Sequence, residues 1–133
     1  MTDPQLQRPL VAWFAQTIDC HEPNAMADFY VAALGGRVAK READCTSVEA
    51  GGLLLNFRAV PAYRPPTWPS ADVPMQQHFE WVVEDLEGAA EQLVKLGASV
   101  AEHQNPDDPH LLVMLDPAGH PLCIIRSSAA ARY

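Results

Sequence analysis

The sequence has few basic residues. Its 133 residues include 9 Lys and Arg against 17 Asp and Glu, which gives a formal net charge of −8 at pH 7. Binding to nucleic acid depends on clustered positive charge that replaces the counterions of the phosphates. The one local basic run, Arg37, Lys40 and Arg41, fits a solvated strand and turn. We therefore expect no nucleic-acid partner.

Long apolar runs and paired cysteines are also missing. No apolar run approaches the roughly 20 residues that cross a bilayer, and the first residues lack the basic and then apolar pattern of a signal peptide. Cys20, Cys45 and Cys123 are an odd number without metal-type spacing, so reduced thiols are expected. These absences favour a cytoplasmic protein with no membrane partner.

The composition that is present fits one globular domain. Hydrophobic residues make up 48% of the chain and charged residues 20%, and this length is sufficient for one core. We expect residues 1–133 to form a single domain with a proline-rich connection at 61–75. Prolines keep such a segment extended, so Tyr63 and Trp68 on it could cover a cavity mouth, with a packed structural linker as the alternative.

The first half, about residues 10–60, has the pattern of one strand, one helix and three strands. Residues 10–19 are apolar and rich in strand formers. Pro23 suits the first helical position, and apolar residues then follow at the spacing of one helix face until Gly35. Further strands are expected at 38–39, 47–50 and 53–60, with a Gly51-Gly52 turn before the last.

The second half, about residues 76–126, repeats this order. A strand at 77–83 precedes a helix from Asp85 that Gly97 ends, and strands follow around Val100, at 111–115 and at 122–126. Aligning the halves pairs Trp13 with His78, Leu34 with Leu96 and Asn56 with Cys123, with a short insertion around 21–23. The repetition predicts an α+β fold of two βαβββ modules.

Short motifs in both halves carry a family resemblance. They are Asp19-Cys20-His21-Glu22-Pro23, Ala27-Asp28-Phe29-Tyr30, Leu34-Gly35-Gly36, Val83-Glu84-Asp85-Leu86 and Asp116-Pro117-Ala118-Gly119-His120. Their order resembles the glyoxalase, bleomycin-resistance and extradiol-dioxygenase (vicinal oxygen chelate) superfamily, and Trp68-Pro69 with His78 is similar to a glyoxalase-like branch common in actinobacteria. The resemblance implies two modules that curl into a cup with a ligand inside, in a homodimer.

The same resemblance implies four metal-ligand positions, at Trp13, Asn56, His78 and Cys123. Tryptophan cannot ligate a metal and asparagine is a weak neutral donor, so His78 alone suits a metal of oxygen chemistry. Glu80 is the one substitute, because residues two apart on a strand share a face. We therefore expect no metal cofactor, although a divalent metal with atypical ligands remains an alternative.

The leading hypothesis is a metal-independent protein that binds a small aromatic or apolar molecule in its cup. The alternatives are an enzyme, either a lyase or isomerase that uses His78 as base and Glu80 as its orienting carboxylate or a metalloenzyme, and a fold kept for assembly with a partner protein. Ring-cleaving dioxygenase activity is disfavoured. The structural alternatives are that Cys123 only packs in the core and that His78 is a strand histidine whose hydrogen bonds are made within the fold. The expected ligand-binding residues are Trp13, Asn56, Arg58, Tyr63, Trp68, His78 and Cys123.

Overall fold

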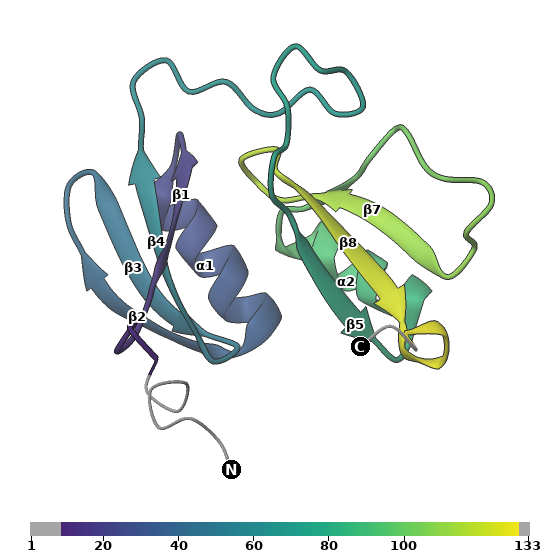
Figure 1. The fold of residues 1–133 in the computed structure, drawn as a ribbon, viewed down its shortest axis with the longest axis horizontal. Helices are drawn as coiled ribbons and strands as arrows, with labels where there is room; N and C mark the ends of the chain where they lie inside the picture. Colours follow the sequence, from purple (N-terminus) through teal and green to yellow (C-terminus); the bar gives the residue numbers. More distant parts are fainter. Residues whose placement is uncertain (1–8, 131–133) are drawn as a thin grey trace.

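The computed structural model describes residues 9–130, which form two modules side by side (Figure 1). Module 1 consists of β1 (Gln16–Cys20), α1 (Pro23–Leu34), β2 (Gly36–Arg41), β3 (Cys45–Ala50) and β4 (Leu53–Ala59). Module 2 consists of β5 (Phe79–Val83), α2 (Leu86–Leu96), β6 (Ser99–Val100), β7 (Leu111–Leu115) and β8 (Pro121–Arg126), and the short 3-10 helix η2 (Ser127–Ala129) follows. The predicted α+β fold with two βαβββ modules is confirmed.

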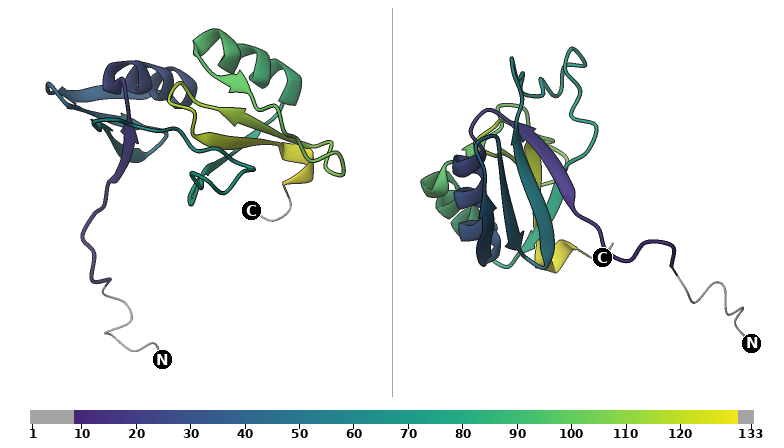
Figure 2. Two further views of the ribbon diagram at one scale, coloured as in Figure 1. Left: turned by 90° about the horizontal axis from the view of Figure 1, so that it is seen from above. Right: turned by 90° about the vertical axis from the view of Figure 1, so that its left-hand side faces the viewer.

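Each module has its own four-stranded mixed sheet. The strand orders are β1-β4-β3-β2 and β5-β8-β7-β6, in which β1 runs parallel to β4 and β5 parallel to β8. Both helices cover the same side of the two sheets, as the left view of Figure 2 shows. The end strands β1 and β5 lie on the facing sides of the two modules (Figure 1). We call the sheet faces opposite the helices the cup faces. None of the helices in the described part of the chain is long and apolar enough to span a membrane.

The helices begin and end where the sequence indicates. Pro23 occupies the first turn of α1, and Gly35 at its end has a φ of 76°, which an L side chain rarely adopts. In α2 the carboxylate of Asp85 accepts a hydrogen bond of 3.0 Å from the Gly88 backbone N–H. These local signals depend on neighbouring residues alone, so they can be read from the sequence.

The core lies between the helices and the sheets and is richest in aromatic rings where the modules meet. The ring of Tyr30, on α1, lies 5.7 Å from the rings of both Phe79 and Trp81 on β5 and 5.1 Å from Phe57 on β4. Phe79 and Trp81 thus pack beneath the helices, on the sheet face opposite to His78, as strand alternation predicts.

A buried hydrogen bond also links the modules. The Tyr30 hydroxyl donates to the Asp116 carboxylate over 2.8 Å, and the two residues are 1% and 3% exposed. The other carboxylate oxygen accepts hydrogen bonds of 2.9 Å from the backbone N–H groups of Ala118 and His120. Burial raises the pKa of Asp116, and the bond from Tyr30 opposes that rise.

The first strand is shorter than the sequence predicts. β1 begins at Gln16, whereas the composition predicts a strand from residue 10, and the side chains of Leu10, Trp13 and Phe14 are exposed. The apolar composition of residues 10–15 indicates a buried strand. A strand also needs a partner, and the ladder to β4 starts only at Gln16.

The register corrects the alignment of the two halves. Thr17 lies opposite Asn56, and Glu80 lies opposite Cys123, so Thr17 and Glu80 are equivalent. The residue equivalent to His78 is then Ala15 rather than Trp13. The short insertion expected around 21–23 is absent as well, because Thr17 and Glu80 precede their helices by the same distance in sequence. The extra residue lies in α1, which has 12 residues against 11 in α2.

The substitution Tyr30→Phe tests the link between modules. Loss of a hydrogen bond to a buried carboxylate is expected to lower the free energy of unfolding by about 1–3 kcal/mol. Because the pKa of Asp116 is raised in the folded protein, the stabilisation by its carboxyl group is complete below the ordinary pKa of 3.8. This stabilisation declines as the pH rises through the pKa of the folded state. Without the Tyr30 bond the folded pKa rises further, so urea unfolding between about pH 4 and pH 8 should show that the decline continues to higher pH in the variant.

Tyr63→Phe is the matched control, because the Tyr63 hydroxyl donates to the backbone carbonyl of Ala118 and not to Asp116. The Tyr63→Phe variant should keep the wild-type dependence of the free energy of unfolding on pH. A Tyr30→Phe variant that lost the same stability at every pH would contradict the assignment.

Candidate functional site

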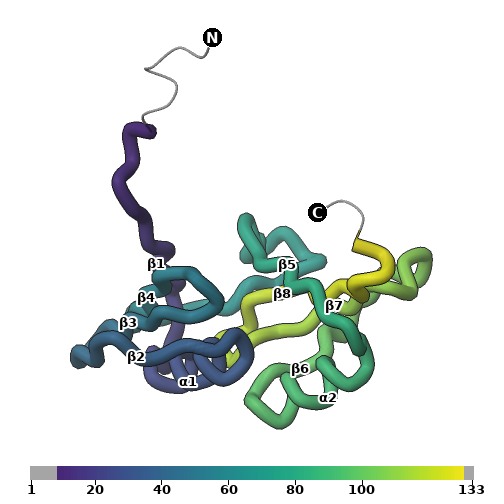
Figure 3. Tube along the Cα trace, turned by 90° about the horizontal axis from the view of Figure 1, so that it is seen from below, coloured from purple at the N-terminus to yellow at the C-terminus, as the bar shows by residue number. Residues whose placement is uncertain are grey.

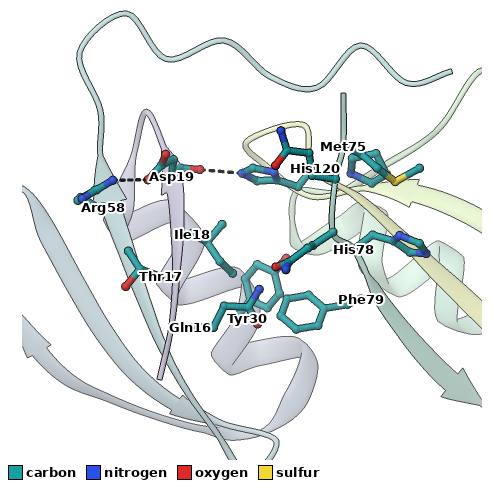
Figure 4. Close-up of a pocket in the computed structure, with 13 residues that line it drawn as sticks. Gln16, Thr17, Ile18, Asp19, Tyr30, Arg58, Met75, His78, Phe79 and His120 are labelled. Atoms are coloured by element: carbon teal, nitrogen blue, oxygen red, sulfur yellow. Dashed lines mark hydrogen bonds and ion pairs between the residues drawn. The ribbon is translucent and has the colours of Figure 1, made fainter. Parts of the chain in front are cut away.

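A cavity of about 410 Å³ lies between the modules (Figure 4). Its walls come from β1 and β4 on one side and, on the other, from the chain that leads into β5 and from the turn before β8. Nine of the lining side chains are polar or charged and four are apolar. They are Gln16, Thr17, Asp19, Tyr30, Arg58, Gln76, Gln77, His78 and His120, and Ile18, Met75, Phe79 and Pro121.

The apolar surface of the cavity belongs to the junction of the modules. Tyr30 and Phe79 lie between the two walls in Figure 4, with their ring planes inclined at 60°. Tyr30 is 1% exposed, and the hydrogen bond to Asp116 holds its ring in place. An aromatic surface that is fixed before any ligand arrives reduces the entropy cost of binding.

The wall from module 1 carries an ion pair. Asp19 on β1 and Arg58 on β4 face each other in register, and Arg58 Nη2 lies 3.0 Å from Asp19 Oδ1. The two side chains are 47% and 58% exposed, so the pair contributes at most about 1 kcal/mol to stability. Because the pair is weak, a ligand with an acceptor group can compete for the guanidinium of Arg58.

His120 joins the turn of module 2 to β1 of module 1. Its Nε2 lies 2.7 Å from the Asp19 backbone carbonyl, which only accepts hydrogen bonds, so Nε2 carries the proton and donates. The Tyr63 hydroxyl lies 3.2 Å from the same nitrogen and donates to the Ala118 carbonyl over 2.8 Å. Burial raises the pKa of Tyr63, so this hydroxyl stays protonated at neutral pH. His120 therefore positions the wall of the cavity.

Cys20 has no role as a nucleophile in this arrangement. Its side chain is fully buried beneath β1, and burial raises the pKa of the thiol to about 11. The thiolate is the reactive form, so this cysteine stays protonated and inert at neutral pH.

The structure brings only two of the seven expected ligand-binding residues, Arg58 and His78, to the cavity. Trp13 lies before β1 and is 73% exposed. Asn56 is on the cup face but accepts a hydrogen bond of 2.6 Å from Ser47. Cys123 lies opposite Glu80 in the ladder between β5 and β8, and neither lines the cavity.

The two aromatic residues of the linker have separate places. The Tyr63 hydroxyl lies 3.2 Å from Nε2 of His120. Trp68 packs edge to face against His103 with 5.1 Å between the ring centroids, in a second depression that Glu102 and Leu115 also line. Prolines could indicate that the linker is extended, but not which part of module 2 it contacts.

Several residues that line the cavity are not among the ligand-binding residues expected from the sequence. Among them are Gln16, Asp19, Gln77 and His120. The alternation within β1, where Ile18 is buried and Thr17 exposed, is the signal that could have placed Asp19 on the cup face. Nothing local could have shown that the turn at His120 reaches across to β1.

Module 1 offers no imidazole or carboxylate at the positions equivalent to His78, Glu80 and Cys123. Within residues 9–130, no three His, Cys, Asp or Glu side chains come together as metal ligands. At the positions that the register makes equivalent to His78, Glu80 and Cys123, module 1 has Ala15, Thr17 and Asn56. The neutral groups of Thr17 and Asn56 hydrogen bond to each other over 3.3 Å. A metal of oxygen chemistry prefers imidazole and carboxylate ligands, and this pair of neutral side chains offers neither.

Solved structures share this fold at low sequence identity. A glyoxalase-related enzyme from Fulvimarina pelagi matches with a TM-score of 0.61 and 18% identity, over 87% of this chain and 88% of that one. A fosfomycin resistance protein from Mesorhizobium loti matches with a TM-score of 0.65 and 12% identity, over 93% and 98%. A glyoxalase family protein from Enterococcus faecalis has a TM-score of 0.59 and 21% identity, over 87% and 96%. The fold is that of the glyoxalase, bleomycin-resistance and dioxygenase superfamily.

The family follows from the sequence itself. Residues 15–125 match the family model of the glyoxalase-like domain, and the chain belongs to that family. No curated protein shows a significant match. The resemblance that the short motifs carry is thereby confirmed, and the matched range begins just before β1.

The substitution Gly119→Ala tests how the turn at His120 is held. Gly119 has a φ of 88°, and an added Cβ would lie 2.8 Å from Cβ of Pro65 in the linker. We expect a loss of about 1–3 kcal/mol from backbone strain, and a further loss because the linker must move.

Gly52→Ala is the matched control, since Gly52 has a φ of 80° and an added Cβ there meets nothing within 4 Å. The free energies of unfolding of both variants, measured in urea, separate the cost of backbone strain from the cost of the contact with Pro65. Equal losses would show that the linker does not press on this turn.

Proposed function

We propose that this protein binds a small molecule in the cavity between its modules, without a metal. The observation that carries the proposal is the convergence of polar side chains from both modules around a fixed aromatic surface. A volume of about 410 Å³ suits a small organic ligand, and most ligand sites combine an apolar surface with a few directional polar groups.

The lining indicates the chemistry of the ligand. Phe79 is partly buried, with the buried ring of Tyr30 packed against it, and its ring favours a flat apolar or aromatic body. Gln16 and Gln77 offer amide donors and acceptors at the walls, and Arg58 offers a planar guanidinium whose present partner is a weak ion pair. The favoured ligand is an aromatic or apolar body with a hydrogen-bonding or anionic substituent.

An enzyme of the lyase or isomerase type is the second candidate. The observation in its favour is that His78 lines the cavity, opposite Asp19 and Arg58 in Figure 4. A neutral imidazole beside a bound ligand can accept a proton. Glu80, its expected orienting carboxylate, does not line the cavity. Turnover of a ligand that His78→Ala abolishes, with binding retained, would favour this candidate.

Titration of a panel of substituted aromatic acids and amides by calorimetry tests the proposal. A ligand found in this way should bind about tenfold more weakly to Arg58→Ala and to His78→Ala, the effect of losing one hydrogen bond of ~1.4 kcal/mol. Trp68→Ala is the matched control, because Trp68 lies in the second depression and not in this cavity, and its affinity should stay that of the wild type.

Treatment of the protein with a chelator is the second part of the test. Protein treated with a chelator should bind the ligand with unchanged affinity. Loss of binding on chelation, restored by a divalent metal, would overturn the metal-free proposal, and a panel without any ligand would overturn the binding proposal.

A further inference from the structure

The second depression lies between the linker and module 2, and we call it the linker depression. It has a volume of about 560 Å³ and is lined by residues 66–69 of the linker, by residues 101–103 after β6 and by Leu115 on β7. Figure 3 shows the linker in teal on the side of module 2 opposite to α2, and the left view of Figure 2 agrees. The linker depression shares no lining residue with the cavity between the modules, so the two can bind different ligands.

The linker wall of the depression is a closed loop that carries Trp68. The backbone N–H of Thr67 donates to the Val73 carbonyl over 2.8 Å, and the Thr67 hydroxyl accepts a hydrogen bond of 2.8 Å from the Val73 backbone N–H. The Ser70 backbone N–H donates to the Thr67 carbonyl over 2.8 Å. These bonds hold both ends of the loop together, so the position of Trp68 is set by the loop itself.

The opposite wall is held by the side-chain amide of Gln104. Its Nε2 donates to the carbonyls of Ala101 and Val113 over 2.8 Å each, and its Oε1 accepts a hydrogen bond of 2.9 Å from the Val113 backbone N–H. The segment that carries Glu102 and His103 is thereby tied to β7. Because both walls are fixed before any ligand arrives, the entropy cost of binding between them is reduced.

The side chains of the linker depression favour a cation. The half-buried ring of Trp68 packs edge to face with His103, and tryptophan has the aromatic face that attracts cations most strongly. Within residues 9–130 the carboxylate of Glu102 forms no ion pair or hydrogen bond. Neither Lys nor Arg is among the described residues that line the depression. The net charge of −8 adds a long-range attraction for cations.

We propose that the linker depression is a second ligand site, which binds a small organic cation with a primary ammonium group on a short apolar body. The ammonium group lies beside the carboxylate of Glu102 and against a face of Trp68, and the apolar body packs on Leu115. A primary ammonium suits the site better than a quaternary one, because the Glu102 carboxylate and a neutral His103 imidazole both accept hydrogen bonds.

The test is a titration of the ¹⁵N-labelled full chain with benzylammonium chloride, followed by NMR at constant ionic strength. The indole N–H resonance of Trp68 and the backbone amide resonances of residues 101–103 should shift and saturate. Benzyl alcohol, which has the same apolar body without the charge, should bind at least about tenfold more weakly, because it makes neither the cation–π contact nor the charge-assisted hydrogen bond.

Three variants separate the site from the overall charge. Glu102→Gln and Trp68→Leu should each raise the dissociation constant of benzylammonium about fivefold, the effect of losing one partly exposed contact to a cation. Glu91→Gln is the matched control, because Glu91 is an exposed residue of α2 that does not line the depression. This variant loses the same charge and should bind benzylammonium as the wild type does.

Three outcomes would overturn the proposal. Equal weakening by Glu102→Gln and Glu91→Gln would show that the cation responds only to the net charge of the protein. Equal affinity for benzyl alcohol would show that the ammonium group is not recognised. Shifts confined to Gln77 and His78 would place the cation in the cavity between the modules, which these residues line.

Discussion

The two modules are joined at Tyr30, and the rest of the structure depends on this residue. Each sheet completes its own hydrogen bonds within its module, so the sheets alone do not fix how the modules sit together. Tyr30 extends from α1 of module 1 and meets Phe79 and Trp81 of module 2 through its ring and Asp116 through its hydroxyl. Because its ring also lines the cavity, the contact that joins the modules also shapes the cavity between them.

The buried carboxylate of Asp116 is costly to desolvate, and three hydrogen bonds offset that cost. Two of them come from the backbone of the turn that carries His120. The turn is therefore held in one shape, and His120 reaches the backbone of Asp19 on β1. In contrast, the ion pair of Arg58 and Asp19 is half exposed and open to competition. The cavity thus combines a turn held in one conformation with the guanidinium of Arg58, whose exposed ion pair a ligand can replace.

Membership of the glyoxalase-like family defines the fold of this chain and leaves its chemistry open. Function depends on the few side chains that face the cup, where the strands of module 1 present Thr17 and Asn56 beside the ion pair of Asp19 and Arg58. Thr17 and Asn56 hydrogen bond to each other and carry no charge. The cavity is instead rich in amides, with histidines from module 2, which fits recognition by hydrogen bonds over an aromatic surface.

The sequence by itself determined the two modules, their helices and most of their strands. Helix ends at Pro23, Gly35 and Gly97 and the alternation of β4 are local properties, readable from spacing and backbone preference. Only the tertiary structure decided the register and the site. Whether an apolar run such as residues 10–15 is paired depends on a distant strand, and the reach of Tyr30 and His120 across the junction depends on how two separately folded modules meet.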